Sequence, residues 1–95
     1  MGLEASGIEV DPSTLDPIKE SGLLGLLLPG GGYSEYVKVD RRHIINFPTD
    51  FSVDQASAIP EVWLTAYLLI QLSGIKKGEY AYINAGASGV GTALT

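Results

Sequence analysis

The chain has 95 residues and a mass of 10.0 kDa, which allows one small domain and excludes two independent cores. Eleven acidic against six basic residues give a net charge of -5, so the chain would repel a phosphate backbone and nucleic acid is excluded as a partner. The absence of cysteine excludes disulfides, cysteine zinc sites and catalytic thiols. A hydrophobic fraction of 45% with 18% charged residues is typical of a folded core.

The start of the chain carries no targeting signal, because Met1 is not followed by a basic run and an apolar core. The apolar stretch over residues 62–72 is about half as long as the roughly 20 residues that a membrane-spanning helix needs. The sequence therefore predicts a soluble, cytoplasmic chain with no membrane partner.

The first half reads as β-strands joined by turns. Residues 23–28 are apolar apart from Gly25 and lie between Gly22 and Pro29, which predicts a buried strand between two breakers. The three glycines at 30–32 predict a turn, and residues 33–39 predict a second strand.

The pattern changes to helical spacing after Pro48. Ser52 and Gln55 form a capping-box pair, which predicts a short helix over residues 53–58. A longer helix is predicted from Pro60 to about Ser73, ending at Gly74. It is apolar nearly all round, so we expect other structure to enclose it on most sides.

The last segment predicts a turn at residues 76–78, a strand over residues 79–85, and a glycine-rich turn over residues 86–91 that leads into the start of a helix. Strand, glycine turn and helix open a βαβ unit, which needs about 30 residues and a second parallel strand. The sequence therefore predicts that the chain is a fragment of a longer protein.

The glycine-rich turn is the strongest site signal. In the dinucleotide-binding fingerprint, Gly86 and Gly91 occupy the first and third glycine positions, and Ser88 stands at the second. Glycines let a backbone approach a pyrophosphate, and Ser88 could donate its hydroxyl to a phosphate. The same serine could equally be the N-cap of a tight structural turn, and both interpretations stay open.

Two other interpretations of this turn fail. A nucleophile elbow needs glycine at position 90, where the chain has Val90, and it needs a histidine downstream, whereas the only histidine is His43. A nucleotide-hydrolysing phosphate loop needs a lysine directly after the glycines, and the last lysine is Lys77. His43 itself is interpreted as a surface residue.

Thr65 is a polar residue on the apolar helix. An enclosed hydroxyl needs a partner, either a backbone carbonyl one turn back or a ligand, and the residues alone favour the carbonyl.

Four ordered blocks together resemble a known family. They are residues 2–7, 27–33, 58–67 and 85–92, and the chain resembles the zinc-free quinone oxidoreductases of the medium-chain dehydrogenase/reductase superfamily. The likeness extends over nearly the whole chain and is greatest to the zeta-crystallin-like, tumour-suppressor-inducible branch.

The resemblance implies an α/β fold in two parts. Residues 1–58 would form an incomplete GroES-like catalytic domain, part of a partly open barrel, and residues 59–95 a junction helix followed by the first strand and glycine turn of a Rossmann nucleotide-binding domain. Zinc-dependent relatives have a histidine ligand where this chain has Leu3, so no metal is expected.

The resemblance also implies the activity. NADPH would donate a hydride to a quinone or another conjugated carbonyl acceptor, and full-length relatives would be homodimers. The residues implied to lie along the cofactor are Thr65, Ser88, Gly89, Val90 and Gly91.

Other parts of such an enzyme are not in the chain. The tyrosine and asparagine near the substrate would precede Met1, so no catalytic acid or base is assigned. The groups that distinguish NADPH from NADH would follow Thr95. Two alternatives remain: an inactive truncated product that docks onto a partner, and an enoyl or alkenal reductase of the same superfamily.

Overall fold

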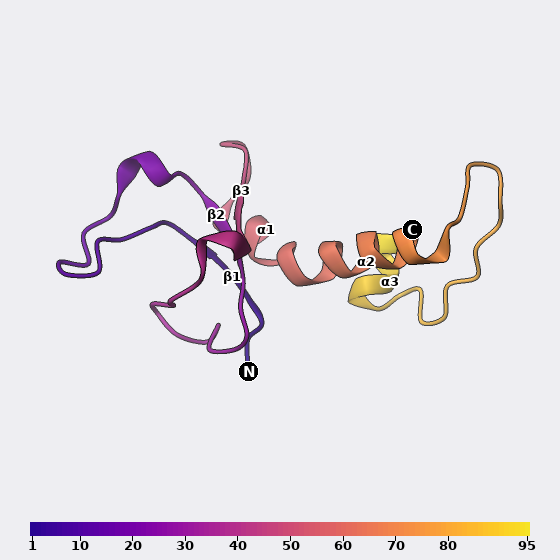
Figure 1. Ribbon diagram of the computed structural model, residues 1–95, viewed down its shortest axis with the longest axis horizontal. Coiled ribbons are helices and arrows are strands. Elements are labelled where there is room, and N and C mark those ends of the chain that lie inside the picture. Colours follow the sequence, from indigo (N-terminus) through magenta and orange to yellow (C-terminus); the bar gives the residue numbers. More distant parts are fainter. The chain divides into compact units, whose positions relative to one another are not determined.

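The structure is a computed structural model that describes residues 1–95. The chain forms two compact units, Met1–Pro60 and Glu61–Thr95, and each is described by itself. The first unit is built on a small sheet and the second on two helices, so the chain belongs to the α/β class, as predicted (Figure 1).

The first unit contains a three-stranded antiparallel sheet. Its strands are β1 (Glu4–Gly7), β2 (Leu24–Leu27) and β3 (Ile44–Asn46), in the order β1-β2-β3 (Figure 1). The central strand β2 confirms the strand predicted at residues 23–28. The sequence does not predict the edge strands β1 and β3. Strand β1 has no large apolar side chain that could show alternation, and β3 has only three residues.

The core of this unit is formed by the side chains on one face of β2. Leu24, Leu26 and Leu28 point to one face of the sheet because side chains alternate along a strand, and all three are buried. Partly buried apolar side chains pack against them: Ala5, Val37, Val39 and Ile44.

The strand predicted over residues 33–39 is wrong. Residues 32–36 form a turn and bends, and residues 37–39 have no regular secondary structure and no strand partner. Val37 and Val39 nevertheless share a face and pack on the leucine cluster, so the apolar alternation reflects burial rather than sheet pairing.

Helix α1 (Val53–Ser57) closes the unit on the sheet. Its capping box is confirmed: the Gln55 N–H donates to the Ser52 hydroxyl over 3.1 Å, and the Ser52 N–H donates to the Gln55 side chain over 2.9 Å. The Ser6 hydroxyl of β1 donates to the Val53 carbonyl over 2.6 Å, so the start of α1 is tied to the edge strand.

The second unit contains α2 (Pro60–Ser73), whose first residue closes the first unit, and α3 (Gly89–Leu94). The predicted helix 60–73 is confirmed, with Gly74 in the left-handed conformation (φ 67°) just past its end. No helix of the chain is both long and apolar enough to span a bilayer.

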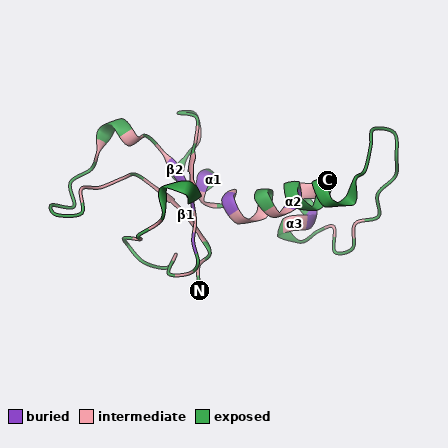
Figure 2. Cartoon of the chain, viewed as in Figure 1, coloured by how far each residue is buried: buried purple, intermediate pink, exposed green.

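The expectation that α2 is enclosed on most sides is wrong. Ala66 is buried, but the large side chains are exposed, from 41% for Ile70 to 75% for Leu72 (Figure 2). The reason is that residues 75–95 supply one six-residue helix and no sheet, which cannot cover a helix that is apolar all round.

The strand predicted over residues 79–85 is also wrong. Residues 79–83 have no regular secondary structure and no strand partner. A β-strand exists only through ladder hydrogen bonds to a neighbour, and the second unit contains no other strand to supply them. The turn predicted at residues 76–78 is confirmed, closed by a hydrogen bond from the Glu79 N–H to the Lys76 carbonyl.

Candidate functional site

The glycine-rich turn joins residues 79–83 to α3. Ala85 opens it in the left-handed conformation (φ 55°), and the Ser88 N–H donates to the Ala85 carbonyl over 2.9 Å. The left-handed residue is thus an alanine and not one of the neighbouring glycines. No signal in the sequence points to it, since a side chain other than Asn or Asp is uncommon in this conformation.

Ser88 is the N-cap of α3. Its hydroxyl oxygen accepts the Gly91 N–H over 3.1 Å, and its carbonyl accepts the Thr92 N–H over 2.8 Å. The structural role that the sequence left open is therefore present. Capping uses a lone pair of the hydroxyl and leaves its proton free to be donated to an anion, so the two roles are compatible.

Position 91 has no room for a side chain, so it needs glycine. A Cβ built there would lie 2.7 Å from the Gly86 Cα and would collide with the Ala85 carbonyl oxygen. The absence of a side chain lets α3 sit directly on the turn, which is the role of the third glycine in the dinucleotide fingerprint. Gly86 and Gly89 have room for a Cβ, with their nearest neighbours 3.6 Å away.

The start of α3 offers two backbone donors. The first backbone N–H groups of a helix have no acceptor within that helix. In α3 the Ser88 hydroxyl accepts the Gly91 N–H, so the N–H groups of Gly89 and Val90 are the two that can donate to a ligand. Residues 85–92 contain no ionisable side chain, so the turn can bind an anion but cannot transfer a proton. These features fit the pyrophosphate of a dinucleotide.

Thr65 lies on α2, in the same unit as the turn. It is half-buried and shares a helix face with Val62, three residues earlier. Gly89 lies against that valine, since a Cβ at Gly89 would be 3.6 Å from the Val62 side chain. The structure therefore places the turn beside the helix face that carries Thr65. Its role next to a nicotinamide stays a prediction.

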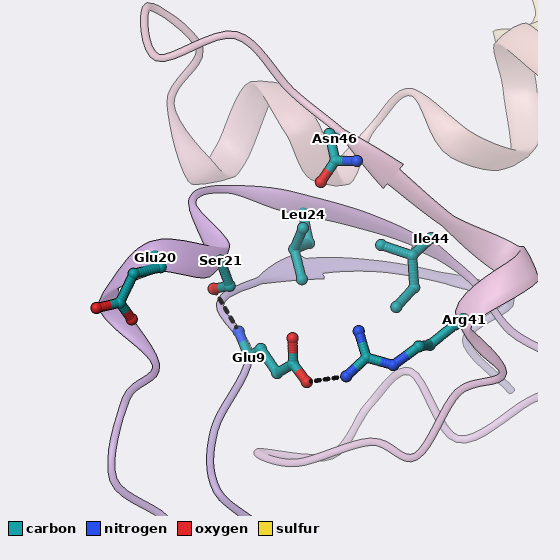
Figure 3. A pocket seen from close by; sticks show the side chains of 7 residues that line it. All are labelled: Glu9, Glu20, Ser21, Leu24, Arg41, Ile44 and Asn46. Atoms are coloured by element: carbon teal, nitrogen blue, oxygen red, sulfur yellow. Dashed lines mark hydrogen bonds and ion pairs between the residues drawn. The ribbon is translucent and has the colours of Figure 1, made fainter.

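The first unit has a hollow of about 310 Å³ that contains none of the predicted site residues. Figure 3 shows the Arg41 guanidinium bonded to the Glu9 carboxylate at 2.7 Å, with Glu20 lying apart from this pair. The remaining lining residues are Ser21, Leu24, Ile44 and Asn46. Because the single cation is already paired, the hollow offers no charge for an anionic ligand.

A second hollow, of about 370 Å³, lies beside Asp40 and His43. The Arg42 guanidinium holds both oxygens of Asp40, at 3.0 and 2.8 Å, and this lowers the pKa of the carboxyl to about 2. His43 is exposed, in agreement with its interpretation as a surface residue. The structure brings no three His, Asp or Glu side chains together as a metal site.

Comparison of the structure with solved structures finds a quinone oxidoreductase from Thermus thermophilus, which was solved alone and in complex with NADPH. The TM-score is 0.72 and the sequence identity 33%, over 79% of this chain and 25% of the oxidoreductase. The sheet and helices described above thus correspond to part of that fold.

Sequence comparison finds polyketide synthases. The phenolphthiocerol synthesis polyketide synthase Pks15/1 of Mycobacterium bovis is 38% identical over 98% of the chain, and the reducing polyketide synthase rdc5 of Metacordyceps chlamydosporia is 33% identical over the same share. The chain spans 4% of the length of each. No protein-family model matches it. The chain therefore has part of the fold of a quinone oxidoreductase and is similar in sequence to a short stretch of polyketide synthases.

Proposed function

We propose that the chain forms part of an NADPH-dependent reductase that delivers a hydride to a conjugated carbonyl acceptor. The observation that carries this proposal is the likeness, at 33% identity and a TM-score of 0.72, to an oxidoreductase solved with NADPH. When bound, NADPH supplies the hydride, and the reduced product takes its proton from water or from a group outside the residues of the turn.

The turn at residues 85–91 is the proposed pyrophosphate site. The Gly89 and Val90 amides would donate to the phosphate oxygens, and the Ser88 hydroxyl would add a third donor while it caps α3. Gly91 would act indirectly, by letting α3 approach the turn. Thr65 would lie near the cofactor, because Gly89 lies against Val62 on the same face of α2; that it would contact the nicotinamide is what the family resemblance implies.

Two variants of Ser88 separate cofactor binding from capping. Asp caps a helix as well as Ser does, but its negative charge repels a pyrophosphate, so Ser88→Asp should keep the melting temperature and lose NADPH binding. Ser88→Thr keeps an oxygen cap and a hydroxyl donor and should retain both. The readouts are thermal unfolding and calorimetric titration with NADPH.

Equal NADPH affinity in the Asp and Thr variants would contradict the assignment of the turn to the cofactor. A matched control is Gly7→Ala in the first unit, where an added Cβ meets no atom within 4 Å. This variant should leave the NADPH affinity unchanged.

The acceptor has two candidates. A quinone is supported by the structural likeness. An enoyl thioester, which is also a conjugated carbonyl, is supported by the sequence likeness to polyketide synthases, one of them described as reducing. Because the sequence likeness to the reducing polyketide synthase covers 98% of the chain against 79% for the quinone oxidoreductase, we rank the enoyl thioester first.

Loss of NADPH absorbance distinguishes the two acceptors. Faster oxidation with crotonyl thioester than with benzoquinone would support the enoyl reductase. The reverse order would support the quinone oxidoreductase. Binding of NADPH without oxidation by either acceptor would leave the cofactor site in place and contradict turnover by this chain.

A further inference from the structure

The glycine turn has close neighbours on two sides, and one of them belongs to α2. On the first side, position 91 lies against the Ala85 carbonyl and Gly86. On the second side, a Cβ built at Gly89 would lie 3.6 Å from Cγ2 of Val62, and apart from neighbouring residues of the same segment no other atom comes within 4 Å of it. Val62 is therefore the side chain that α2 places against the turn.

Val62 is suited to fix the position of a neighbouring backbone. Both branches of its side chain start at Cβ, and in a helix such a side chain keeps one χ1 rotamer about 90% of the time. It is half-buried, and Ala66, four residues later on the same helix face, is buried. Gly89 thus lies against a stiff side chain on the covered face of α2.

The position of Gly89 matters for the proposed pyrophosphate site, on which this inference rests. The Gly89 N–H is one of two backbone donors that the turn can offer to a phosphate. Residues 85–92 contain no charged side chain, so the affinity for a phosphate depends on how these donors are aimed. Because glycine has the greatest backbone freedom of all residues, a contact from α2 restricts a donor that has no side chain of its own to restrict it.

We propose that Val62 is a positioning residue for cofactor binding, which keeps the Gly89 N–H directed at the pyrophosphate. Val62 acts through Gly89 and not by a polar contact with the cofactor, because its side chain has no donor, acceptor or charge. One face of α2 then contributes to the site twice, through Val62 behind the turn and through Thr65 near the cofactor.

Two variants of Val62 separate positioning from general stability. Val62→Ala removes both branches, and the Kd of NADPH in a calorimetric titration should rise about tenfold, the cost of one misdirected hydrogen bond to a charged group. Val62→Thr keeps two branches on Cβ, so the Kd should stay within about threefold of the wild-type value. Its half-buried hydroxyl should nevertheless lower the melting temperature. Equal rises of the Kd in the two variants would contradict a role for the branched shape.

Leu69→Ala is the matched control on the same helix. Leu69 lies on the same face as Val62, two turns and about 10 Å further along α2. Its truncation also removes apolar side-chain atoms from α2, but it should leave the Kd of NADPH unchanged. If Leu69→Ala raised the Kd as much as Val62→Ala, the effect would belong to the stability of α2, and the positioning role would be wrong.

A double variant tests whether Val62 acts through Gly89. The Cβ added in Gly89→Ala points at position 62, so it partly fills the gap that Val62→Ala leaves. Val62→Ala should therefore raise the Kd about tenfold in the wild-type background but under about threefold in the Gly89→Ala background. The same factor in both backgrounds would mean that the two positions act independently, which would overturn the proposal.

The wild-type chain distinguishes a failure of this inference from a failure of the proposed function. If the wild type does not bind NADPH, the proposed cofactor site is wrong and the inference is wrong with it. If the wild type binds NADPH and Val62→Ala binds it equally well, the cofactor site remains and only the role of Val62 is wrong. Each titration is made at a temperature at which helical circular dichroism shows that the variant is folded.

Discussion

The two units use similar apolar residues with opposite results. In the first unit, alternation along β2 places Leu24, Leu26 and Leu28 on one face, where side chains of the neighbouring strands and of residues 37–39 pack against them. In the second unit, apolar side chains lie all round α2, and its large ones remain exposed, all four leucines among them. Burial thus depends less on hydrophobic content than on whether the pattern presents one face to a layer that the same unit supplies.

We expect the greatest change in unfolding free energy for a buried leucine of the first unit, and a much smaller one for an exposed leucine of the second. Leu26→Ala should cost about 2–5 kcal/mol of unfolding free energy, because it leaves a cavity in the only cluster of buried leucines. Leu68→Ala, at a site that is 55% exposed, should cost under about 1 kcal/mol in the monomer. Chemical denaturation at low protein concentration measures both. Equal losses of unfolding free energy would mean that α2 is as well packed as β2, which would contradict the difference between the two units.

Gly91→Ala should have the next largest effect, about 1–3 kcal/mol, because the new Cβ forces α3 away from Ala85 and Gly86. Gly89→Ala in the same helix has room for its Cβ and should be neutral or stabilising by up to about 1 kcal/mol. Thermal unfolding followed by circular dichroism compares the two. An unchanged melting temperature in Gly91→Ala would contradict the close approach of α3 to the turn.

Loss of a helix cap should lower the free energy of unfolding by a similar amount in both units. Ser52→Ala removes the capping box of α1, and Ser88→Ala removes the cap of α3, at about 1 kcal/mol each. Replacement by Asp should restore stability at both positions. Amide exchange in the first turn of each helix is the measurement, and unchanged exchange in either variant would show that the cap does not hold that helix.

The smallest effect is a dependence on pH that is confined to the first unit. Arg42 lowers the pKa of Asp40 to about 2 from an ordinary value of 3.8, so this ion pair stabilises the folded state above about pH 4 and is lost as the pH falls towards 2. Since the pair is exposed, only a small part of the acid-induced drop in melting temperature should disappear in Asp40→Asn. An identical pH profile in wild type and variant would contradict a native ion pair at this site.

Local signals in the sequence predicted the helices and their caps well. The Ser52 and Gln55 pair, Pro60 and Gly74 each act within one turn of the chain, so their effects do not depend on distant residues. The central strand was also predictable, because Leu23–Leu28 is long enough to show a buried run between breakers.

The errors concern structure that depends on partners. Residues 33–39 and 79–85 carry the side chains of strands, but a strand needs a neighbour at the correct register, and sequence periodicity does not report one. The prediction that α2 is enclosed was wrong for the same reason, because enclosure depends on neighbouring structure. In the candidate site, the glycine at position 91 was predictable from the fingerprint, whereas the left-handed Ala85 was not.

Amide hydrogen exchange with and without NADPH is the experiment that decides whether the glycine turn binds the cofactor, because it reports on the turn and on the sheet together. We expect NADPH to slow exchange in the segment that contains the Gly89 and Val90 amides and to leave exchange in β2 unchanged. Unaltered exchange over residues 85–94 at saturating NADPH would contradict the assignment of the glycine turn to the cofactor.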